Sequence, residues 1–200
     1  MRKLFAFLVV TADGYYAGSN DEFDWPNVDE EFNEFAIRQL NSVDALLFGR
    51  VTYEFMAGFW PTEAAKQSDP AIAHAMNTVA KVVFSATLEK AEWDPSTLVR
   101  SGVAEEISKL KAKPGKELAI FGSPTFATSV LAMGLIDELR IMVHPIVLGA
   151  GKSIFKEIGD RVRLKLLRTT TFSSGNVLLC YQPVPRRSGG SGDQGVSFRE

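Results

Sequence analysis

The chain has 200 residues, of which 46% are hydrophobic and 23% charged, and its formal net charge is −2. This length fits one domain that can bury a core without disulfides or metal. The scattered basic residues form no phosphate-tracking stripe, which argues against nucleic acid, and no apolar run reaches the roughly 20 residues that span a bilayer.

The N-terminal half predicts buried strands that alternate with helices. Its first residues are basic and then apolar, as in a signal peptide, but the run is short and no cleavage site follows. We therefore expect a strand at 3–10 in a cytoplasmic protein. Apolar residues recur at steps of three and four through 29–43, which predicts a helix with acids in its first turn. The next expected elements are a strand at 45–48, helices at 52–59 and 70–79, and strands at 81–85 and 98–99.

The C-terminal half continues this alternation and then changes to consecutive strands. We expect a helix at 103–110, a strand at 117–121 and a helix at 125–133 that stops at Gly134. The order predicts a three-layer α/β domain over residues 1–183, with a mostly parallel sheet and antiparallel strands at its end. Residues 184–200 are rich in Gly, Ser and Arg, a composition typical of a disordered tail. The consecutive strands are expected at 139–147, 163–170 and 176–182.

Single reactive side chains give little sign of a nucleophile or a metal. Cys180 lies in an apolar strand with no histidine near it in the sequence, which indicates a buried, inert thiol. His144 precedes a proline in another apolar strand, so we interpret it as a structural histidine. No group of His, Cys and carboxylate residues has metal-ligand spacing, and we expect no metal.

Two segments combine a buried strand, a glycine turn and a helix start. Amides at a helix start carry partial positive charge, and beside a glycine they form a site for phosphate. One such segment is equally well explained as an ordinary turn, whereas two in one small sheet predict a site for both ends of a dinucleotide. The GxGxxG fingerprint and the P-loop lysine motif are absent from the sequence. The turn residues are Gly49, Arg50, Thr52, Gly122, Ser123 and Thr125.

Several short motifs follow one another along nearly the whole chain. They are Thr11-Ala-Asp-Gly-Tyr-Tyr-Ala-Gly18, Asp24-Trp25, Phe48-Gly-Arg-Val-Thr-Tyr-Glu54, Gly122-Ser-Pro-Thr-Phe126, Leu135-Ile-Asp-Glu-Leu139 and His144-Pro-Ile-Val-Leu-Gly-Ala-Gly151. The series resembles the dihydrofolate reductase-like superfamily over about residues 2–182. Within it, the chain is most similar to the C-terminal reductase domain of bacterial bifunctional riboflavin-biosynthesis deaminase-reductases.

The resemblance implies an NADPH-dependent reductase with the three-layer α/β/α fold of that superfamily. It assigns the cofactor phosphates to the two glycine turns, and the 2′-phosphate that distinguishes NADPH from NADH to Arg50, Ser85 and Thr87. The family usually has two glycines where this chain has Gly122-Ser123, which predicts strain at the serine. The loop at 13–17 corresponds to one that closes over nicotinamide and excludes water. The residues nearest the nicotinamide are then Val10, Thr11, Tyr16 and Ala17.

The proton donor and the substrate contacts are less sharply indicated. Folate reductases place a carboxylate on the helix after the closing loop, where this chain has Asp29, Glu30 and Glu31. Acids at a helix start are also typical of solvated residues that stabilise the helix dipole. We take Asp29 as the candidate catalytic residue, and Asp24 with Trp25 as candidate substrate contacts.

The implied activity is reduction of a small heterocycle, as in 5-amino-6-(5-phosphoribosylamino)uracil reductases. Such enzymes need basic side chains at the substrate phosphate, yet the sequence has no lysine or arginine cluster near the closing loop and no deaminase domain. The alternatives are a pterin reductase of the dihydrofolate reductase type and a catalytically silent nucleotide-binding protein on the same fold. Relatives of the riboflavin type commonly dimerise through the late strands, so we expect a homodimer.

Overall fold

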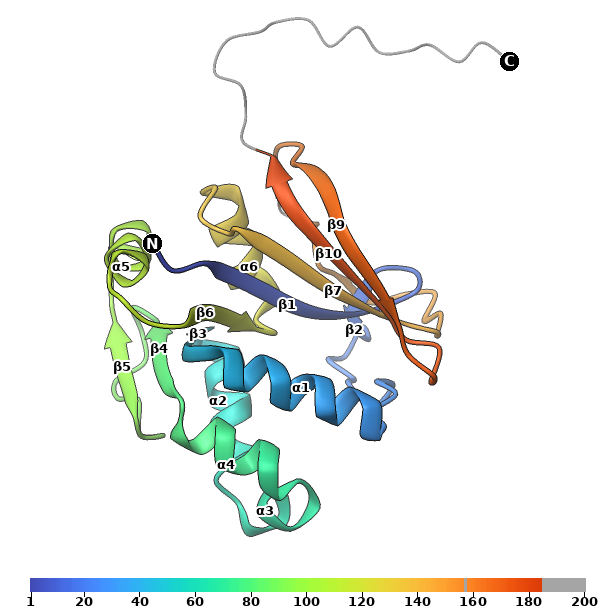
Figure 1. The fold of residues 1–200 in the computed structure, drawn as a ribbon, viewed down its shortest axis with the longest axis horizontal. Coiled ribbons are helices and arrows are strands. Elements are labelled where there is room, and N and C mark those ends of the chain that lie inside the picture. Colours follow the sequence, from blue (N-terminus) through green and yellow to red (C-terminus); the bar gives the residue numbers. More distant parts are fainter. Residues whose placement is uncertain (157, 185–200) are drawn as a thin grey trace, which may run out of the picture.

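A computed structural model describes residues 1–156 and 158–184 of the chain. Across these residues, one large sheet forms the centre of the molecule (Figure 1) and contains the strands β1 (Leu4–Thr11), β3 (Val43–Gly49), β4 (Ala80–Phe84), β5 (Ser96–Val99), β6 (Glu117–Phe121), β7 (Glu138–His144), β9 (Arg163–Thr171) and β10 (Val177–Val184). Their order is β5-β4-β3-β6-β1-β7-β10-β9. Neighbours from β5 to β7 are parallel, whereas β10 is antiparallel to both β7 and β9.

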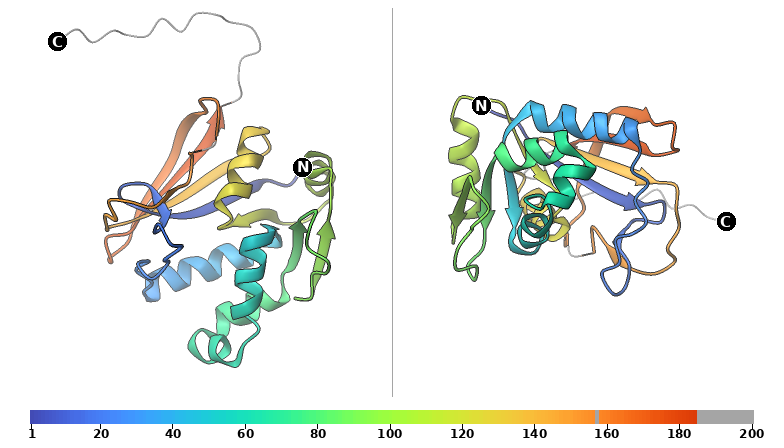
Figure 2. Two further views of the ribbon diagram at one scale, coloured as in Figure 1. Left: turned by 180° about the vertical axis from the view of Figure 1, so that it is seen from behind. Right: turned by 90° about the horizontal axis from the view of Figure 1, so that it is seen from below.

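Helices cover both faces of this sheet. Helices α5 and α6 lie on one face, and α1, α2 and α4 lie on the other (Figure 2). Their apolar side chains belong to two separate core clusters, one on each face. The short helix α3 leads into α4. The helices are α1 (Glu30–Ser42), α2 (Arg50–Phe59), α3 (Glu63–Ser68), α4 (Pro70–Thr78), α5 (Val103–Ala112) and α6 (Pro124–Ala132).

The near-continuous apolar sequence of β1 follows from its position between these two layers. Successive side chains of a strand point to opposite faces. Ala6 and Leu8 therefore join the core that contains α5 and α6, while Phe5 and Phe7 join the core that contains α1. A strand covered on both faces needs apolar residues at every position. The three-layer, mostly parallel fold expected from the sequence is thus confirmed.

The observed elements differ from the predicted ones at a few places. β7 ends at His144, three residues before the predicted end, because Pro145 has no N–H to donate to the sheet. β10 extends to Val184, one residue into the predicted tail, and residues 185–200 lie outside the described part. The sequence also missed α3 and a small antiparallel pair, β2 (Tyr15–Ala17) with β8 (Lys152–Ser153), whose strands are too short to show alternation.

A network of charged side chains is buried where β7 begins. Glu138 Oε1 accepts hydrogen bonds from Arg140 Nε and Arg168 Nη2, each at 2.6 Å. The Arg140 guanidinium also lies 3.5 Å from the centre of the Phe5 ring and donates to Gln39. Burial alone would raise the pKa of Glu138, but the hydrogen bonds and charges of the two arginines outweigh it and lower the pKa. The network lies at the amino edge of the sheet, away from the glycine turns.

Three further sequence expectations concern membranes, metals and the cysteine. In the part of the chain that the structure describes, every helix is too short or too polar to cross a bilayer. Within the same residues, no group of three His, Cys, Asp or Glu side chains is placed to hold a metal ion. Cys180 is a free, fully buried thiol, as predicted, and burial raises its pKa.

Candidate functional site

The two predicted glycine turns meet at the carboxyl edge of the sheet. β3 and β6 are parallel neighbours, so their carboxyl ends lie side by side. α2 begins directly after Gly49 and α6 directly after Ser123. The amide of Gly49 donates to Ser123 Oγ at 3.1 Å, and Thr52 lies beside Gly122. The two helices therefore direct their amino ends to one corner, and the amino end of a helix is a place where phosphate can bind.

Each glycine of this corner is required by its surroundings. A Cβ added at Gly49 would lie 2.9 Å from Ser123 Oγ and 3.1 Å from Phe126 Cβ, so no side chain fits without movement. Gly122 has a φ of +63°, in the left-handed region that favours glycine. Ser123 follows with a φ of +53°, a left-handed backbone conformation that is uncommon for a residue other than glycine.

A cavity of about 660 Å³ opens beside this corner, between α6 and the β2–β8 pair. Tyr16 and Thr125, both predicted cofactor contacts, line it. Met133 and Ile154 supply apolar surface, and Lys152 supplies a positive charge. The cavity therefore joins the predicted closing loop to the amino end of α6.

A second, wider hollow of about 690 Å³ is lined by the predicted contacts Arg50 and Thr87, and also by Leu88, Lys90 and three glutamates, Glu54, Glu89 and Glu92. Arg50 Nη1 forms an ion pair with Glu54 Oε2 at 2.9 Å across one turn of α2. Ser85 Oγ accepts hydrogen bonds from the amides of Thr87 and Leu88, at 3.2 and 2.9 Å. The Ser85 hydroxyl thus shapes the turn after β4, and its predicted contact with a 2′-phosphate would have to share this oxygen with two amides.

The predicted closing loop is fixed at its base by Asp13. The Thr11 hydroxyl donates to Asp13 Oδ1 at 2.6 Å, and the amide of Gly149 donates to Asp13 Oδ2 at 2.8 Å. The hydrogen bond from Thr11 is the main reason why the pKa of Asp13 is lowered, and the carboxylate is ionised near neutral pH. Val10, Thr11 and Ala17 are themselves buried. Asp13 therefore couples this loop to the segment that precedes β8.

His144 lies next to Thr11, at the carboxyl end of β7. Its side chain is fully buried, and its Nδ1 accepts a hydrogen bond from the amide of Asn27 at 2.9 Å. The rings of Trp25 and Phe32 pack against it with centroids 5.6 and 6.1 Å away. Because Nδ1 accepts, the neutral ring carries its proton on Nε2. The predicted substrate contact Trp25 is thus placed near the strand end predicted to meet nicotinamide.

Several buried polar atoms around His144 have no hydrogen-bond partner among the residues that the structure describes. The loop at 24–27 reaches the β9–β10 turn, where Asn27 Nδ2 donates to the Ser174 carbonyl and Asn176 Nδ2 donates to the Asn27 carbonyl. Buried polar groups in folded proteins nearly always have a partner. This neighbourhood therefore holds unused hydrogen-bonding capacity, on the atoms Trp25 Nε1, His144 Nε2, Ser174 Oγ and Asn176 Oδ1.

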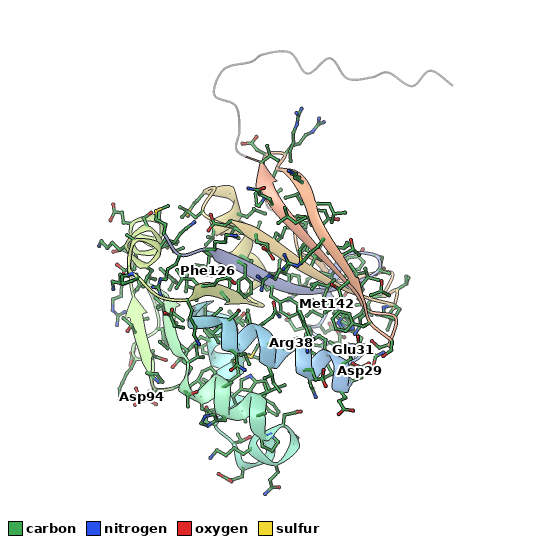
Figure 3. The ribbon with its side chains drawn as sticks, viewed as in Figure 1. Asp29, Glu31, Arg38, Asp94, Phe126 and Met142 are labelled. Atoms are coloured by element: carbon green, nitrogen blue, oxygen red, sulfur yellow. The ribbon has the colours of Figure 1, made fainter. Side chains whose placement is uncertain are left out.

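Two acidic residues, Asp29 and Glu31, lie at the amino end of α1 (Figure 3). Asp29 caps the helix, since its Oδ1 accepts from the Phe32 amide at 2.8 Å. Glu31 Oε2 accepts from the amide and the hydroxyl of Ser173, each at 2.8 Å, which ties the helix to the β9–β10 turn. Asp24 is exposed to solvent. Asp29 and Glu31 thus have structural partners, and the catalytic role of Asp29 stays a prediction.

The burial of His144 predicts a pH dependence of stability. Burial lowers the pKa of His144 below its ordinary value of 6.5. The unfolded chain therefore takes up a proton before the folded one, and this contribution to stability is complete above pH 6.5 and declines as the pH falls below it. Urea unfolding between pH 8 and 5 measures the effect.

Two variants test whether His144 causes this decline in stability. His144→Phe removes the titrating ring, so the decline in stability between pH 7 and 5.5 should become shallower. His74→Gln, at the exposed histidine of α4, should leave the decline as in the parent. An unchanged decline in His144→Phe would show that His144 does not cause it.

Sequence reasoning missed the residues that reach the site from distant parts of the chain. In the sequence, Asp13 is only one residue of the motif at 11–18, whereas its carboxylate accepts from the amides of Leu148 and Gly149 and so connects this motif to the one at 144–151. Lys152 and Asn176 carried no local signal at all. They lie here only because β8 pairs with β2 and because the β9–β10 turn packs on the 24–27 loop.

Comparisons with solved structures agree with this architecture. A protein of Shewanella provisionally assigned to riboflavin biosynthesis aligns with a TM-score of 0.70 and 24% identity, over 92% of this chain and 99% of that one. The deaminase/5-amino-6-(5-phosphoribosylamino)uracil reductase of Thermotoga maritima gives 0.66 and 14% identity, over 92% and 57% of the two chains. Dihydrofolate reductase from Enterococcus faecalis, solved with NADP(H), gives 0.59 and 14%, over 90% and 96%.

Sequence comparisons identify the family. The uncharacterised protein YyaP of Bacillus subtilis is 33% identical over 182 residues, which cover 90% of this chain and 94% of YyaP. The family model of the RibD C-terminal domain matches residues 2–178, nearly all of the described part. These residues include both glycine turns and the loop at 13–17. The chain therefore belongs to the RibD C-terminal domain family.

Proposed function

We propose that this protein is an NADPH-dependent reductase of a small heterocyclic substrate, of the pyrimidine reductase type. The observation that carries the proposal is the hydrogen bond between Gly49 and Ser123, because it brings the starts of two helices to one corner of the sheet. Family membership supports the reaction class, since a Thermotoga maritima structure with the same fold bears the name of a uracil-type reductase.

In this proposal the cofactor lies along the carboxyl edge of the sheet. Its phosphates contact the corner formed by Gly49, Thr52, Gly122, Ser123 and Thr125. Its 2′-phosphate occupies the hollow that Arg50 and Thr87 line, where it would replace Glu54 as the partner of Arg50. Its nicotinamide end reaches Val10, Thr11, Tyr16 and Ala17, and NADPH there supplies a hydride.

The substrate is proposed to bind beside His144 and Trp25. The Nε2–H of His144 and the Nε1–H of Trp25 have no partner within the described part of the chain, and such donors suit a carbonyl oxygen of a heterocycle. Asp29 keeps its role as the proposed proton donor: Oδ1 caps the helix, and Oδ2 accepts no hydrogen bond among the described residues. Asp24 completes the proposed substrate contacts.

Titration with NADPH tests the proposal. Quenching of tryptophan fluorescence should report binding at micromolar concentrations, and NADH should bind about tenfold more weakly because it lacks the 2′-phosphate. Loss of NADPH absorbance with a panel of pyrimidinones and pterins then tests turnover. Failure to bind NADPH below millimolar concentrations would refute the proposal, and binding without turnover across the panel would favour a silent nucleotide-binding protein.

We also propose that the protein is a homodimer that pairs through β9. Every residue of this edge strand is exposed, including Leu164, Leu166 and Leu167. Exposed leucines on an unpaired strand edge are typical of surfaces that a partner covers. Light scattering should give twice the chain mass of 22.0 kDa, and a monomer at micromolar concentration would refute the proposal.

A further inference from the structure

The 660 Å³ cavity between α6 and the β2–β8 pair carries more positive charge than the glycine turns themselves. Lys152, in β8, and Lys156, four residues later, both line it. Among the described residues that line the cavity, none is an aspartate or glutamate. A cavity of this size with two cations, and with no carboxylate in its described lining, favours an anionic ligand.

The charge of Lys152 is secured by its neighbour. Its Nζ donates to Asp21 Oδ1, and this hydrogen bond raises the pKa of Lys152, which keeps the ammonium protonated at neutral pH. Asp21 itself does not line the cavity, and it is largely exposed. An ammonium has three N–H donors, so Lys152 can contact Asp21 and a ligand in the cavity together.

Hydroxyl groups and the amino end of α6 complete the lining. Thr125, Ser129 and Ser153 place hydroxyls at the cavity, and Pro124 and Thr125 form the first turn of α6. Ser129 donates to the carbonyl of Thr125, so its oxygen is still able to accept. Ammonium groups, hydroxyls and a helix start are the groups that bind phosphate oxygens in proteins.

We propose that Lys152 and Lys156 form a phosphate-binding site beneath the closing loop. The inference rests on the proposed reductase function and extends it to residues that the glycine turns do not include. The pyrophosphate of the dinucleotide is the favoured ligand, because Tyr16 and Thr125 line the same cavity and Thr125 also belongs to the α6 turn. A phosphate ester on the substrate has the same chemistry and is the second source.

The site would also couple the cofactor to the closing loop. Lys152 pairs across the small sheet with Ala17, and Tyr15 pairs with Ser153. A phosphate that binds the ammonium of Lys152 therefore contacts the strand that holds the loop at 15–17 in place. Bound phosphate should stabilise the β2–β8 pair, which hydrogen exchange of the Tyr15 and Ala17 amides can follow.

The test compares two double variants that remove the same charge. Lys152→Gln/Lys156→Gln alters the cavity, whereas Lys66→Gln/Lys109→Gln removes two exposed lysines from α3 and α5 as a control. NADPH, ribose 5-phosphate and inorganic pyrophosphate are titrated against both variants and the parent by calorimetry at two salt concentrations. Thermal unfolding confirms that each variant is folded.

We expect the cavity variant to bind NADPH about tenfold more weakly, with a smaller dependence on salt, and the control variant to match the parent. Weaker binding of ribose 5-phosphate with unchanged NADPH binding would support the site and assign it to a substrate phosphate. Unchanged binding of all three ligands would overturn the inference.

The outcome for the parent protein separates this inference from the proposed function. If the parent does not bind NADPH, the proposed function fails, and the comparison of pyrophosphate binding between parent and cavity variant still tests the phosphate site.

Asp21→Asn gives a change of opposite sign: it frees the ammonium of Lys152, so pyrophosphate should bind more tightly. Weaker binding of pyrophosphate to Asp21→Asn would contradict the assigned role of Lys152.

Discussion

Replacing Gly49 by valine is expected to weaken NADPH binding strongly while the fold persists. The backbone at Gly49 is extended, with φ −77° and ψ 162°, which valine adopts without strain. The obstacle is space, because a Cβ at this position meets Ser123 Oγ at 2.9 Å and Phe126 Cβ at 3.1 Å. Separating the two helix starts removes charge-assisted hydrogen bonds worth about 3 kcal/mol together, or about a hundredfold in affinity.

Gly58 provides the matched control for this substitution. It lies in α2, the helix that begins directly after Gly49, and a Cβ added there meets nothing within 4 Å. Gly58→Ala should therefore leave NADPH affinity unchanged and raise stability by about 0.5–1 kcal/mol, since alanine favours a helix interior. Fluorescence titration and urea unfolding measure both quantities. NADPH affinity within threefold of the parent in Gly49→Val would show that the corner does not bind the phosphates.

Replacing Glu138 by alanine is expected to be the most destabilising single change at the amino edge of the sheet. Both Arg140 and Arg168 donate to the same oxygen of Glu138 at 2.6 Å. Its removal leaves the buried guanidinium of Arg140 without its closest carboxylate. Such a loss costs about 3–5 kcal/mol, which lowers the melting temperature by about 10 °C in a domain of this size.

The same carboxylate predicts a loss of stability in acid. The folded-state pKa of Glu138 is lowered, so its contribution to stability is complete above the unfolded value of about 4.3 and disappears as the pH falls through the folded value.

Glu34→Ala is the control for Glu138→Ala, because the ion pair of Glu34 with Arg38 is exposed and worth at most about 0.5 kcal/mol. Calorimetry at pH 7 measures both variants. A Glu138→Ala protein as stable as Glu34→Ala would refute the role assigned to the network.

Much of the fold could be predicted because its signals are local. The continuous apolar residues of β1 indicate a strand covered on both faces, and the spacing of apolar residues in α1 indicates one buried helix face. Gly134 marks the end of α6, where it adopts a φ of +70°. Gly49 and Gly122 likewise lie at strand ends, so their meeting follows once β3 and β6 are neighbours.

The remainder of the site depends on contacts between distant residues, which leave no local pattern. Lys152 comes to the closing loop through a pair of very short strands, and Asn176 comes to Asn27 across 149 positions of sequence. Asp29 shows the opposite problem. An aspartate at a helix start satisfies the pattern of a catalytic acid and that of a helix cap equally well, and its hydrogen bond to the Phe32 amide fulfils the second.

The serine in the second glycine turn changes what a bound phosphate would encounter. A hydroxyl can accept one hydrogen bond and donate another at the same time. Ser123 Oγ already accepts from the Gly49 amide, so its hydroxyl hydrogen is available to another acceptor. In the proposed complex, a phosphate at the corner would then meet the Ser123 hydroxyl instead of the Gly49 N–H. Ser123→Gly would remove the backbone strain and also the hydrogen bond between the two turns, so the starts of α2 and α6 would bind the same ligand without a direct link between them.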